Sequence, residues 1–393
     1  MIRTYKYRLY PTNAQDRALD FLLWQGRLLY NAALEQRINA YKNDGKSVTY
    51  PQQWAYFRDQ RHENPDTLGK LNAASVQQLL RRLDKAFRSF FRRLKAGEKP
   101  GFPRYKGRTR FNSLEYRHGD GCKLKFDAKH RALLYIQNVG DVKVKYHRPI
   151  PDEARIKHVV LKRKNRKWYI CLQIELPDPV VGEHSGPAVG IDMGLHSILA
   201  SSDGQTIENP RWLRKSLAKL RVAQRRLSRR KKGGARRRKA AAQVARLHER
   251  ITNQRLDFWH KTTRRLVDTY GLIAVEDLTL NFLTSNRHLA LSAHDAGLGM
   301  FRQLLAYKAE SAGVRVVAVN PAHTSQVCSS CGELVEKTLG VRIHRCPSCG
   351  YTADRDVNAA RNILDLAVKS ARTGPPGVNV AGCGVRSLGS SLL

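Results

Sequence analysis

The chain has 393 residues, more than one hydrophobic core usually serves, so we expect two or three domains. Its 71 Lys and Arg against 33 Asp and Glu give a formal charge of +38, which favours a polyanionic partner: nucleic acid first, with a ribosomal protein or a membrane-surface binder as alternatives. The opening residues, MIRTYKYRLYPTNAQ, hold no continuous apolar stretch, which excludes a signal peptide or spanning helix there and predicts a cytoplasmic protein, nucleoid-associated when bound to DNA, with no membrane contact.

The first hundred residues show strand alternation and then helical periodicity. Residues 2–10 alternate like a β-strand, and Pro11, Thr12 and Asn13 then offer a stop followed by a helix cap. The helical pattern continues to about residue 95, and two apolar stripes predict its buried faces: Leu19, Leu22, Leu23, Leu28 and Leu29, then Val76, Leu79, Leu80, Leu83, Phe87, Phe90 and Phe91. Basic residues fill the polar face of the second stripe, which is typical of a helix that contacts phosphates: Arg81, Arg82, Lys85, Arg88, Arg92, Arg93 and Lys95.

Residues 99–110, KPGFPRYKGRTR, break the helical pattern and interleave aromatic with basic residues. This composition suits base stacking beside phosphate contacts, and a plain linker is the alternative. From residue 111 to about 178, segments such as ALLYIQNV, VKVKYH, KHVVLKRK and KWYICLQIEL are rich in Val, Ile and Tyr, which is typical of strands. We expect a small twisted sheet or barrel that closes with the strand at 2–10, with the helical block as an insertion.

The second half begins after a linker at residues 179–188, PVVGEHSGPA, and alternates strands with one long basic segment. Three strands are predicted within AVGIDMGLHSILASSDGQTIEN, and further buried strands in GLIAVEDL and GVRVVAVN. Between Arg211 and Arg250 there are 17 Lys or Arg and one acid, Glu249, in a helical pattern that Gly233 and Gly234 split into a hairpin. Because a solvated coiled coil would mix both signs of charge, the hairpin favours nucleic-acid contact. Its candidate contacts are Arg225, Arg226, Arg229, Arg230, Lys231 and Lys232.

Three acids stand at the ends of predicted elements. Asp192 ends an apolar strand in GIDMG, Glu276 ends another in LIAVEDL, and Asp356 opens a helical segment in DRDVNAARNIL. In a chain that binds a polyanion, such carboxylates would repel the partner unless they held divalent cations, and Mg²⁺ prefers oxygen ligands. We therefore expect a catalytic magnesium site, with two ions roughly 3.5–4 Å apart that activate water and stabilise the leaving oxygen of a phosphodiester.

Four of the seven cysteines form two close pairs, Cys328 with Cys331 and Cys346 with Cys349, separated by 14 residues. Each pair has the C-x2-C spacing of a zinc site and is followed by a glycine that permits a tight turn. Four thiolates complete a tetrahedral shell, so the site is expected to be structural; disulfides, the alternative, are disfavoured in a reducing compartment. Cys122 and Cys171 are expected to be small buried residues.

The order of these motifs resembles the C-terminal half of TnpB-type proteins, which are transposon-encoded relatives of type V CRISPR effectors. The resemblance lies in GIDMG, the basic hairpin, VEDL, NPAHTSQVCSSCG, CPSCG and DRDVNAARNI, and extends to RLYPT, KPGFPRYKGR and LALSAHDAG, so that it covers nearly all of residues 1–365. It implies a prokaryotic, RNA-guided DNA endonuclease with a ribonuclease-H-like (RuvC) site formed by Asp192, Glu276 and Asp356. Asp356 is preferred over Asp354 because the family's acid directly precedes x-N-A-A; Asp354 is then a helix cap.

The resemblance also implies the partners and the domain order of this α+β multidomain chain. A guide RNA from the transposon end would pair with a double-stranded DNA target, and the protein, as a monomer on its RNA, would read a short adjacent motif with Tyr50 and Gln77. The expected domains are a β-barrel-like wedge domain (1–10 and 111–180), a helical recognition insertion (11–110), a RuvC domain of α/β type (181–321 and 353–369), a zinc-binding module (322–352) and a disordered tail (370–393).

Three other functions fit parts of the pattern. A DNA-binding regulator, whether guided by RNA or recognising DNA through the protein itself, could share the fold without cutting, but it would not need the three acids. A strand-transfer transposase also uses three carboxylates with metal, and its joined products would distinguish it. A structural zinc component of a ribonucleoprotein suits the composition but leaves the acids at the strand ends unexplained.

Overall fold

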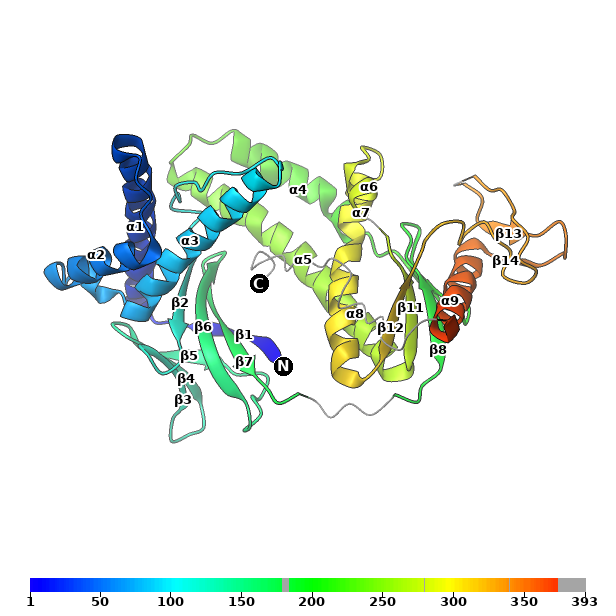
Figure 1. Cartoon of the computed structure of the whole chain (residues 1–393), viewed down its shortest axis with the longest axis horizontal. Helices are drawn as coiled ribbons and strands as arrows, with labels where there is room; N and C mark the ends of the chain where they lie inside the picture. Colours follow the sequence, from blue (N-terminus) through cyan, green and yellow to red (C-terminus); the bar gives the residue numbers. More distant parts are fainter. Residues whose placement is uncertain (179–183, 279, 339, 374–393) are drawn as a thin grey trace. The chain divides into compact units, whose positions relative to one another are not determined.

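The computed structural model describes residues 1–178, 184–278, 280–338 and 340–373 (Figure 1). The chain divides after Asp178 into two compact units, each with its own hydrophobic core. Both units contain helices and β-sheet, so the prediction of a mixed α+β chain is confirmed. Among the described residues, no helix is long and apolar enough to cross a membrane.

The N-terminal unit contains a seven-stranded antiparallel sheet with the order β2-β6-β7-β1-β5-β4-β3. Its strands are β1 (Ile2–Tyr10), β2 (Ser113–Arg117), β3 (Cys122–Phe126), β4 (Ala132–Ile136), β5 (Gly140–Lys145), β6 (Arg155–Lys164) and β7 (Lys167–Glu175). The first strand lies inside this sheet, where Tyr5 pairs with Leu172 of β7 and Arg8 with Lys145 of β5. A segment from the beginning of the chain therefore pairs with strands that follow the helices of this unit in the sequence.

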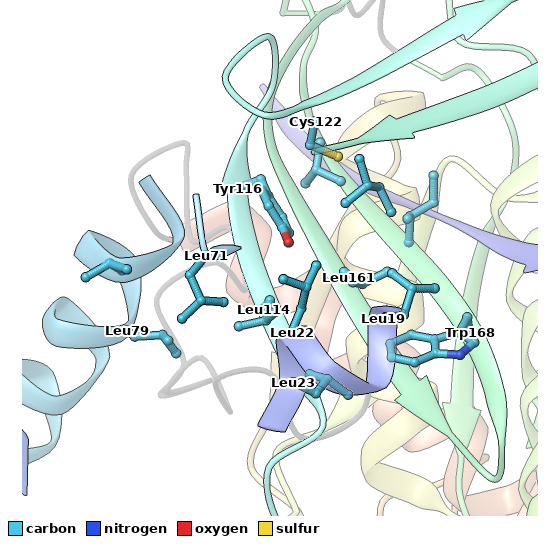
Figure 2. Packing of buried hydrophobic residues seen from close by; sticks show 14 of the residues in the cluster. Leu19, Leu22, Leu23, Leu71, Leu79, Leu114, Tyr116, Cys122, Leu161 and Trp168 are labelled. Atoms are coloured by element: carbon cyan, nitrogen blue, oxygen red, sulfur yellow. The ribbon is translucent and has the colours of Figure 1, made fainter. Parts of the chain in front are cut away.

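The helices between β1 and β2 are α1 (Asn13–Asp44), α2 (Tyr50–Glu63), the 3-10 helix η1 (Leu68–Lys70) and α3 (Ala73–Lys95). A helix cap was predicted here, and the structure assigns it to Thr12: its hydroxyl accepts from the Gln15 backbone N–H while the Gln15 side chain accepts from the Thr12 N–H. Figure 2 shows leucines of α1 and α3 packed among side chains of the sheet, including Leu114 and Trp168.

Two positions of the predicted apolar stripes are exposed. Leu28 of α1 is 39% exposed and Phe91 of α3 is 57% exposed, so the prediction was wrong for both. The fully buried part of α3 ends at Leu83, although its apolar periodicity continues for two more turns. Periodicity defines one face of a helix, but it does not tell how far along the helix the packing partner extends.

The C-terminal unit contains a five-stranded sheet with the order β10-β9-β8-β11-β12. Its strands are β8 (Ala188–Asp192), β9 (Ser197–Ser201), β10 (Thr206–Glu208), β11 (Leu272–Glu276) and β12 (Arg315–Val319), which confirms the predicted strands. Strand β11 lies between β8 and β12 and runs parallel to both, and β9 and β10 continue the sheet antiparallel beyond β8. The carboxyl ends of β8, β11 and β12 therefore meet at one edge, where sites in such sheets form.

Six helices complete this unit among the described residues: α4 (Trp212–Ser228), α5 (Ala235–Thr269), α6 (Leu280–Ser285), α7 (Ala290–Ala296), α8 (Leu298–Ala312) and α9 (Arg355–Thr373). The turn at Gly233 and Gly234 separates α4 from α5, as predicted for the basic hairpin. A two-stranded sheet of β13 (Ile343–Arg345) and β14 (Thr352–Asp354) lies directly before α9 (Figure 1).

The last helix packs closely on the sheet. A Cβ atom on Gly190 of β8 would lie 2.0 Å from the Ala360 carbonyl oxygen, so only glycine allows α9 to approach this strand. The helix continues to Thr373, which corrects the predicted start of a disordered tail at residue 370; the Ser370 hydroxyl bonds back to the Ala367 carbonyl. The remainder of that tail, 374–393, and the first part of the predicted linker, 179–183, lie outside the described residues.

Candidate active site and metal centre

Asp192 and Glu276 lie side by side at the carboxyl edge of the five-stranded sheet. β8 ends at Asp192 and its parallel neighbour β11 ends at Glu276. Ile191 pairs with Val275, so the two acids occupy the next matched position of strands about 4.8 Å apart. Matched positions on neighbouring strands direct their side chains to the same face, which brings both carboxylates together.

The third acid comes from the first turn of α9. The close packing of α9 on β8 places the Asp356 carboxylate beside the turn that follows Asp192, where a Cβ on Gly194 would lie 3.8 Å from Asp356 Oδ2. Asp354 caps the helix as expected, because its Oδ1 accepts from the backbone N–H groups of Asp356 (2.8 Å) and Val357 (3.2 Å). Cap and candidate ligand are therefore separate residues.

Burial raises the pKa of all three carboxylates. Desolvation raises the pKa of Asp192 well above its usual range, and the negative charges of Glu276 and Asp356 raise it further. Desolvation also raises the pKa of Glu276 and of Asp356. Arg342 forms a long ion pair with this cluster, with its Nη1 3.9 Å from Asp356 Oδ1. The site concentrates hard oxygen donors that repel one another, and this donor set fits a divalent cation such as Mg²⁺.

The four cysteines of the two C-x2-C pairs converge. Their Sγ atoms all lie within 4.8 Å of one another, with Cys328 3.7 Å from Cys349 and Cys331 3.6 Å from Cys346. A disulfide would require about 2.05 Å, and these cysteines are free thiols. A tetrahedron of sulfurs at the Zn–S distance of about 2.3 Å has edges of about 3.8 Å, so the arrangement fits one zinc ion in a closed shell.

Each cysteine pair closes on the predicted tight turn. Gly332 and Gly350 have φ angles of +82° and +72°, values that favour glycine. Their backbone N–H groups donate to the carbonyls of Cys328 (2.9 Å) and Cys346 (3.0 Å). The sequence therefore predicted this centre down to its turns.

Side chains of α9 hold the cysteine segment in place. The Asn358 amide nitrogen donates to the Val327 carbonyl (2.7 Å) and its oxygen accepts from the Ser329 N–H (3.0 Å). Asn362 donates to the carbonyls of Thr324 (2.8 Å) and Val327 (2.7 Å). The sequence analysis assigned no role to these residues; the available signal was a pair of asparagines four apart on a helix whose buried positions after Arg355 are otherwise apolar.

Tyr50 and Gln77, the predicted readers of a DNA motif, lie on neighbouring helices of the N-terminal unit. Tyr50 begins α2, and the Arg81 guanidinium of α3 lies 5.6 Å from the centre of its ring. Gln77 precedes Arg81 by one helical turn, so both can face the same side as Tyr50. Arg82 differs, because it is half-buried and its Nη1 donates to the Ser113 carbonyl (3.4 Å). It has less freedom than Arg81 to contact a phosphate.

The six basic residues predicted at the tip of the hairpin are all exposed. They lie at the end of α4 and in the turn before α5: Arg225, Arg226, Arg229, Arg230, Lys231 and Lys232. No acid occurs among residues 211–248, so this end of the hairpin carries charge of one sign. Such a surface suits the backbone of a nucleic acid.

A buried acid at the base of the hairpin was not predicted. Asp295 of α7 is 1% exposed, and its two oxygens accept from the backbone N–H groups of Leu213 (2.8 Å) and Arg214 (3.1 Å). It also accepts from Arg255 Nη2 at 3.5 Å. Asp295 thus caps α4 from another helix, which a search for caps within the sequence of α4 itself cannot find.

Comparison with family models gives three matches along the chain. A model described as "Probable transposase" matches residues 171–287, one described as "Cas12f1-like, TNB domain" matches residues 299–363, and one described as "Helix-turn-helix domain" matches residues 1–46. Within residues 1–46 the structure has one strand and one continuous helix, β1 and α1, and not a pair of helices.

Full-length relatives and solved structures agree with these matches. The chain is 35% identical to a Streptomyces pristinaespiralis protein named "Putative RNA-guided DNA endonuclease", over 95% of this chain and 91% of that protein. It is 29% identical to the Escherichia coli K12 protein InsQ, which bears the same description, over 92% of each chain. A Cas12f1 structure, solved as a complex with a single-guide RNA and target DNA, shares the fold with a TM-score of 0.60 at 15% identity and covers 93% of this chain and 98% of that one.

Proposed function

The chain belongs to the OrfB (IS605) family of TnpB-type proteins, and we propose that it works as an RNA-guided DNA endonuclease whose cutting site is formed by Asp192, Glu276 and Asp356. The observation that carries the proposal is the cluster of these three carboxylates at the edge of the five-stranded sheet. A DNA-binding regulator gains nothing from buried acids that repel one another and repel DNA.

The three acids would hold Mg²⁺, and we propose that they hold two ions. When bound, Mg²⁺ supplies positive charge and Lewis acidity at the scissile phosphate. The protein's own part is to keep the oxygen donors together: β8 and β11 fix Asp192 and Glu276 in register, and α9 brings Asp356 beside them. Because the pKa values of these carboxylates are raised, a proton and a metal ion would compete for the same oxygen atoms.

The cysteine centre would hold zinc in a structural role. Cys328, Cys331, Cys346 and Cys349 supply a complete tetrahedral shell, which leaves no position open for a substrate. The segment that they fold is held against the helix that carries Asp356. Zinc would therefore stabilise one wall of the cutting site.

We propose that the N-terminal unit recognises the target. Its sheet, with strand 2–10 and strands from 111–180, would be the wedge domain, and the helices of 11–110 would read the DNA beside the target through Tyr50, Gln77 and Arg81. Residues 181–321 and 353–369 would be the ribonuclease-H-like RuvC domain around the zinc module at 322–352. Guide RNA would lie along basic surfaces such as the hairpin tip, and pairing with the DNA target would supply sequence specificity.

The function can be tested by expressing the protein with its native flanking DNA and sequencing the RNA that copurifies with it. We expect a discrete RNA that ends in variable sequence, and Mg²⁺-dependent cleavage of a DNA that matches this end. A DNA with a scrambled match is the control and should stay intact.

Two other results would contradict the proposal. Heterogeneous RNA without guided cleavage would indicate a protein that reads DNA directly or serves as a structural component. Joined strands in place of simple breaks would indicate a strand-transfer transposase.

A further inference from the structure

We infer that Thr324 is a positioning residue for the cutting site, which orients Glu276 and thereby connects the cysteine centre to the carboxylates. This inference rests on the proposed function. Thr324 stands four residues before Cys328 and is 4% exposed. It contacts the acid of β11 from the segment that begins the cysteine module.

The contact with Glu276 is short and well defined. Thr324 Oγ1 lies 2.5 Å from Glu276 Oε1 and 3.1 Å from the Pro321 carbonyl oxygen. A hydroxyl has one proton, and the shorter distance to the charged acceptor assigns that proton to Glu276. The Thr324 hydroxyl therefore fixes one oxygen of the Glu276 carboxylate, and the remaining lone pairs of this carboxylate stay available on the side of the neighbouring acids.

Thr324 is itself fixed from α9. Asn362 donates its amide to the Thr324 carbonyl at 2.8 Å and to the Val327 carbonyl at 2.7 Å. One helical turn earlier, Asn358 holds Val327 and Ser329, which flank the ligand Cys328. The helix that carries Asp356 thus also sets the position of the hydroxyl that contacts Glu276.

Arg355 of α9 adds further hydrogen bonds between this helix and the cysteine module. It is 9% exposed and donates to the carbonyls of Thr338 (2.8 Å) and Val341 (3.3 Å) and to the Ser325 hydroxyl (3.3 Å). These contacts join the residue before Asp356 to the residue after Thr324 and to the loop between the cysteine pairs. The two clusters therefore share one hydrogen-bonded frame.

Such a frame makes a specific prediction for metal binding. A hydrogen bond that orients a metal ligand changes metal affinity or activity by roughly 10- to 100-fold when it is lost. Thr324→Val keeps the shape of the side chain and removes the hydroxyl, whereas Thr324→Ser keeps the hydroxyl and removes a methyl group. We expect the valine variant to need roughly 10-fold more Mg²⁺ than wild type, and the serine variant to remain within about threefold.

The experiment is a Mg²⁺ titration of the guide-bound protein with two readouts. The first is the rise in melting temperature without target DNA, which reports binding directly; the second is the rate of guided cleavage. Zinc content and melting temperature without Mg²⁺ verify that each variant is folded. Thr324→Ala replaces the valine variant where valine prevents folding.

The outcomes separate the two proposals. Wild type that cuts guided DNA, with equal Mg²⁺ requirements for wild type and the valine variant, would overturn the role of Thr324 and leave the proposed function intact. Wild type that does not cut guided DNA contradicts the proposed function itself. Equal losses in the serine and valine variants would assign Thr324 to packing alone and also overturn the inference.

Discussion

The carboxylate cluster and the cysteine centre both gather side chains that can carry like charge, but they differ in how the chain builds them. The four cysteines lie within 22 residues of sequence and converge through two tight turns. The three acids span 165 residues and meet only because two parallel strands end together and a helix packs on one of them. A local motif can be recognised by its spacing, whereas a long-range cluster requires the fold.

The two clusters should also respond differently when one member is removed. Thiolates around zinc form a closed shell in which every ligand contributes to local folding. Carboxylates without a metal are desolvated and repel one another, so each one opposes folding until a cation binds. We therefore expect that removing a cysteine ligand lowers the stability of the protein, whereas removing the charge of one of the carboxylates raises the stability of the metal-free protein.

The largest change is expected at the cysteine centre. Cys346→Ser removes one zinc ligand from a type of site whose metal contributes on the order of 10 kcal/mol to folding in isolated zinc-finger peptides. We expect the zinc content to fall, the module at 322–352 to lose protection from hydrogen exchange, and guided cleavage to drop, while RNA binding is retained. Ser348→Ala, at an exposed position of the same turn, is the matched control. Cleavage that stays at the wild-type rate would show that the module is dispensable.

Asp295 sharpens the comparison, because it is a buried acid with satisfied hydrogen bonds. Asn at this position keeps one acceptor and leaves a backbone N–H of α4 without a partner, which costs about 1–3 kcal/mol. Chemical denaturation should therefore show that Asp295→Asn destabilises the protein, and hydrogen exchange should be faster at Leu213 and Arg214. Unchanged stability and exchange would contradict the assigned cap.

Asp192→Asn should have the opposite and smaller effect. The pKa of Asp192 is raised in the folded protein, so metal-free wild type loses stability as pH rises from the unfolded value near 3.8 through the folded value. The Asn variant carries no such penalty, and we expect a higher melting temperature than wild type at neutral pH without metal, with the difference vanishing in acid. Mg²⁺ should stabilise wild type more than the variant. An Asp192→Asn variant that melts at a lower temperature than wild type at neutral pH without metal would contradict this difference between the two clusters.

The sequence predicted the two clusters to different depths. The spacing of Cys328 to Cys349 contains both the ligands and the turns, and the structure confirms their convergence. The patterns around Asp192 and Glu276 predicted that each acid ends a strand, which the structure also confirms. Their parallel register and the approach of α9 at Gly190 depend on contacts between distant segments, which no local pattern contains.

The supporting side chains could not be predicted for the same reason. Thr324 and Asn362 act through a carboxylate and a carbonyl that belong to other elements, and Asp295 caps a helix that begins more than 80 residues earlier. The exposed Leu28 and Phe91 fit the apolar stripes of their helices equally well as the buried members. In each case the missing information is the position of a neighbour in space.

The central claim is that the three carboxylates cut guided DNA, and the most direct measurement compares Asp356→Asn with Asp365→Asn under single-turnover conditions. Both acids belong to α9, but Asp365 is exposed and pairs with Lys369 at 2.6 Å. We expect Asp356→Asn to bind guide RNA and target DNA normally and to cut more than about 100-fold more slowly. Loss of a residue that only supports a metal ligand lowers activity by up to about 100-fold, and loss of a ligand itself should cost more. Asp365→Asn should cut at the wild-type rate. An Asp356→Asn protein that still cuts guided DNA at the wild-type rate would contradict the account.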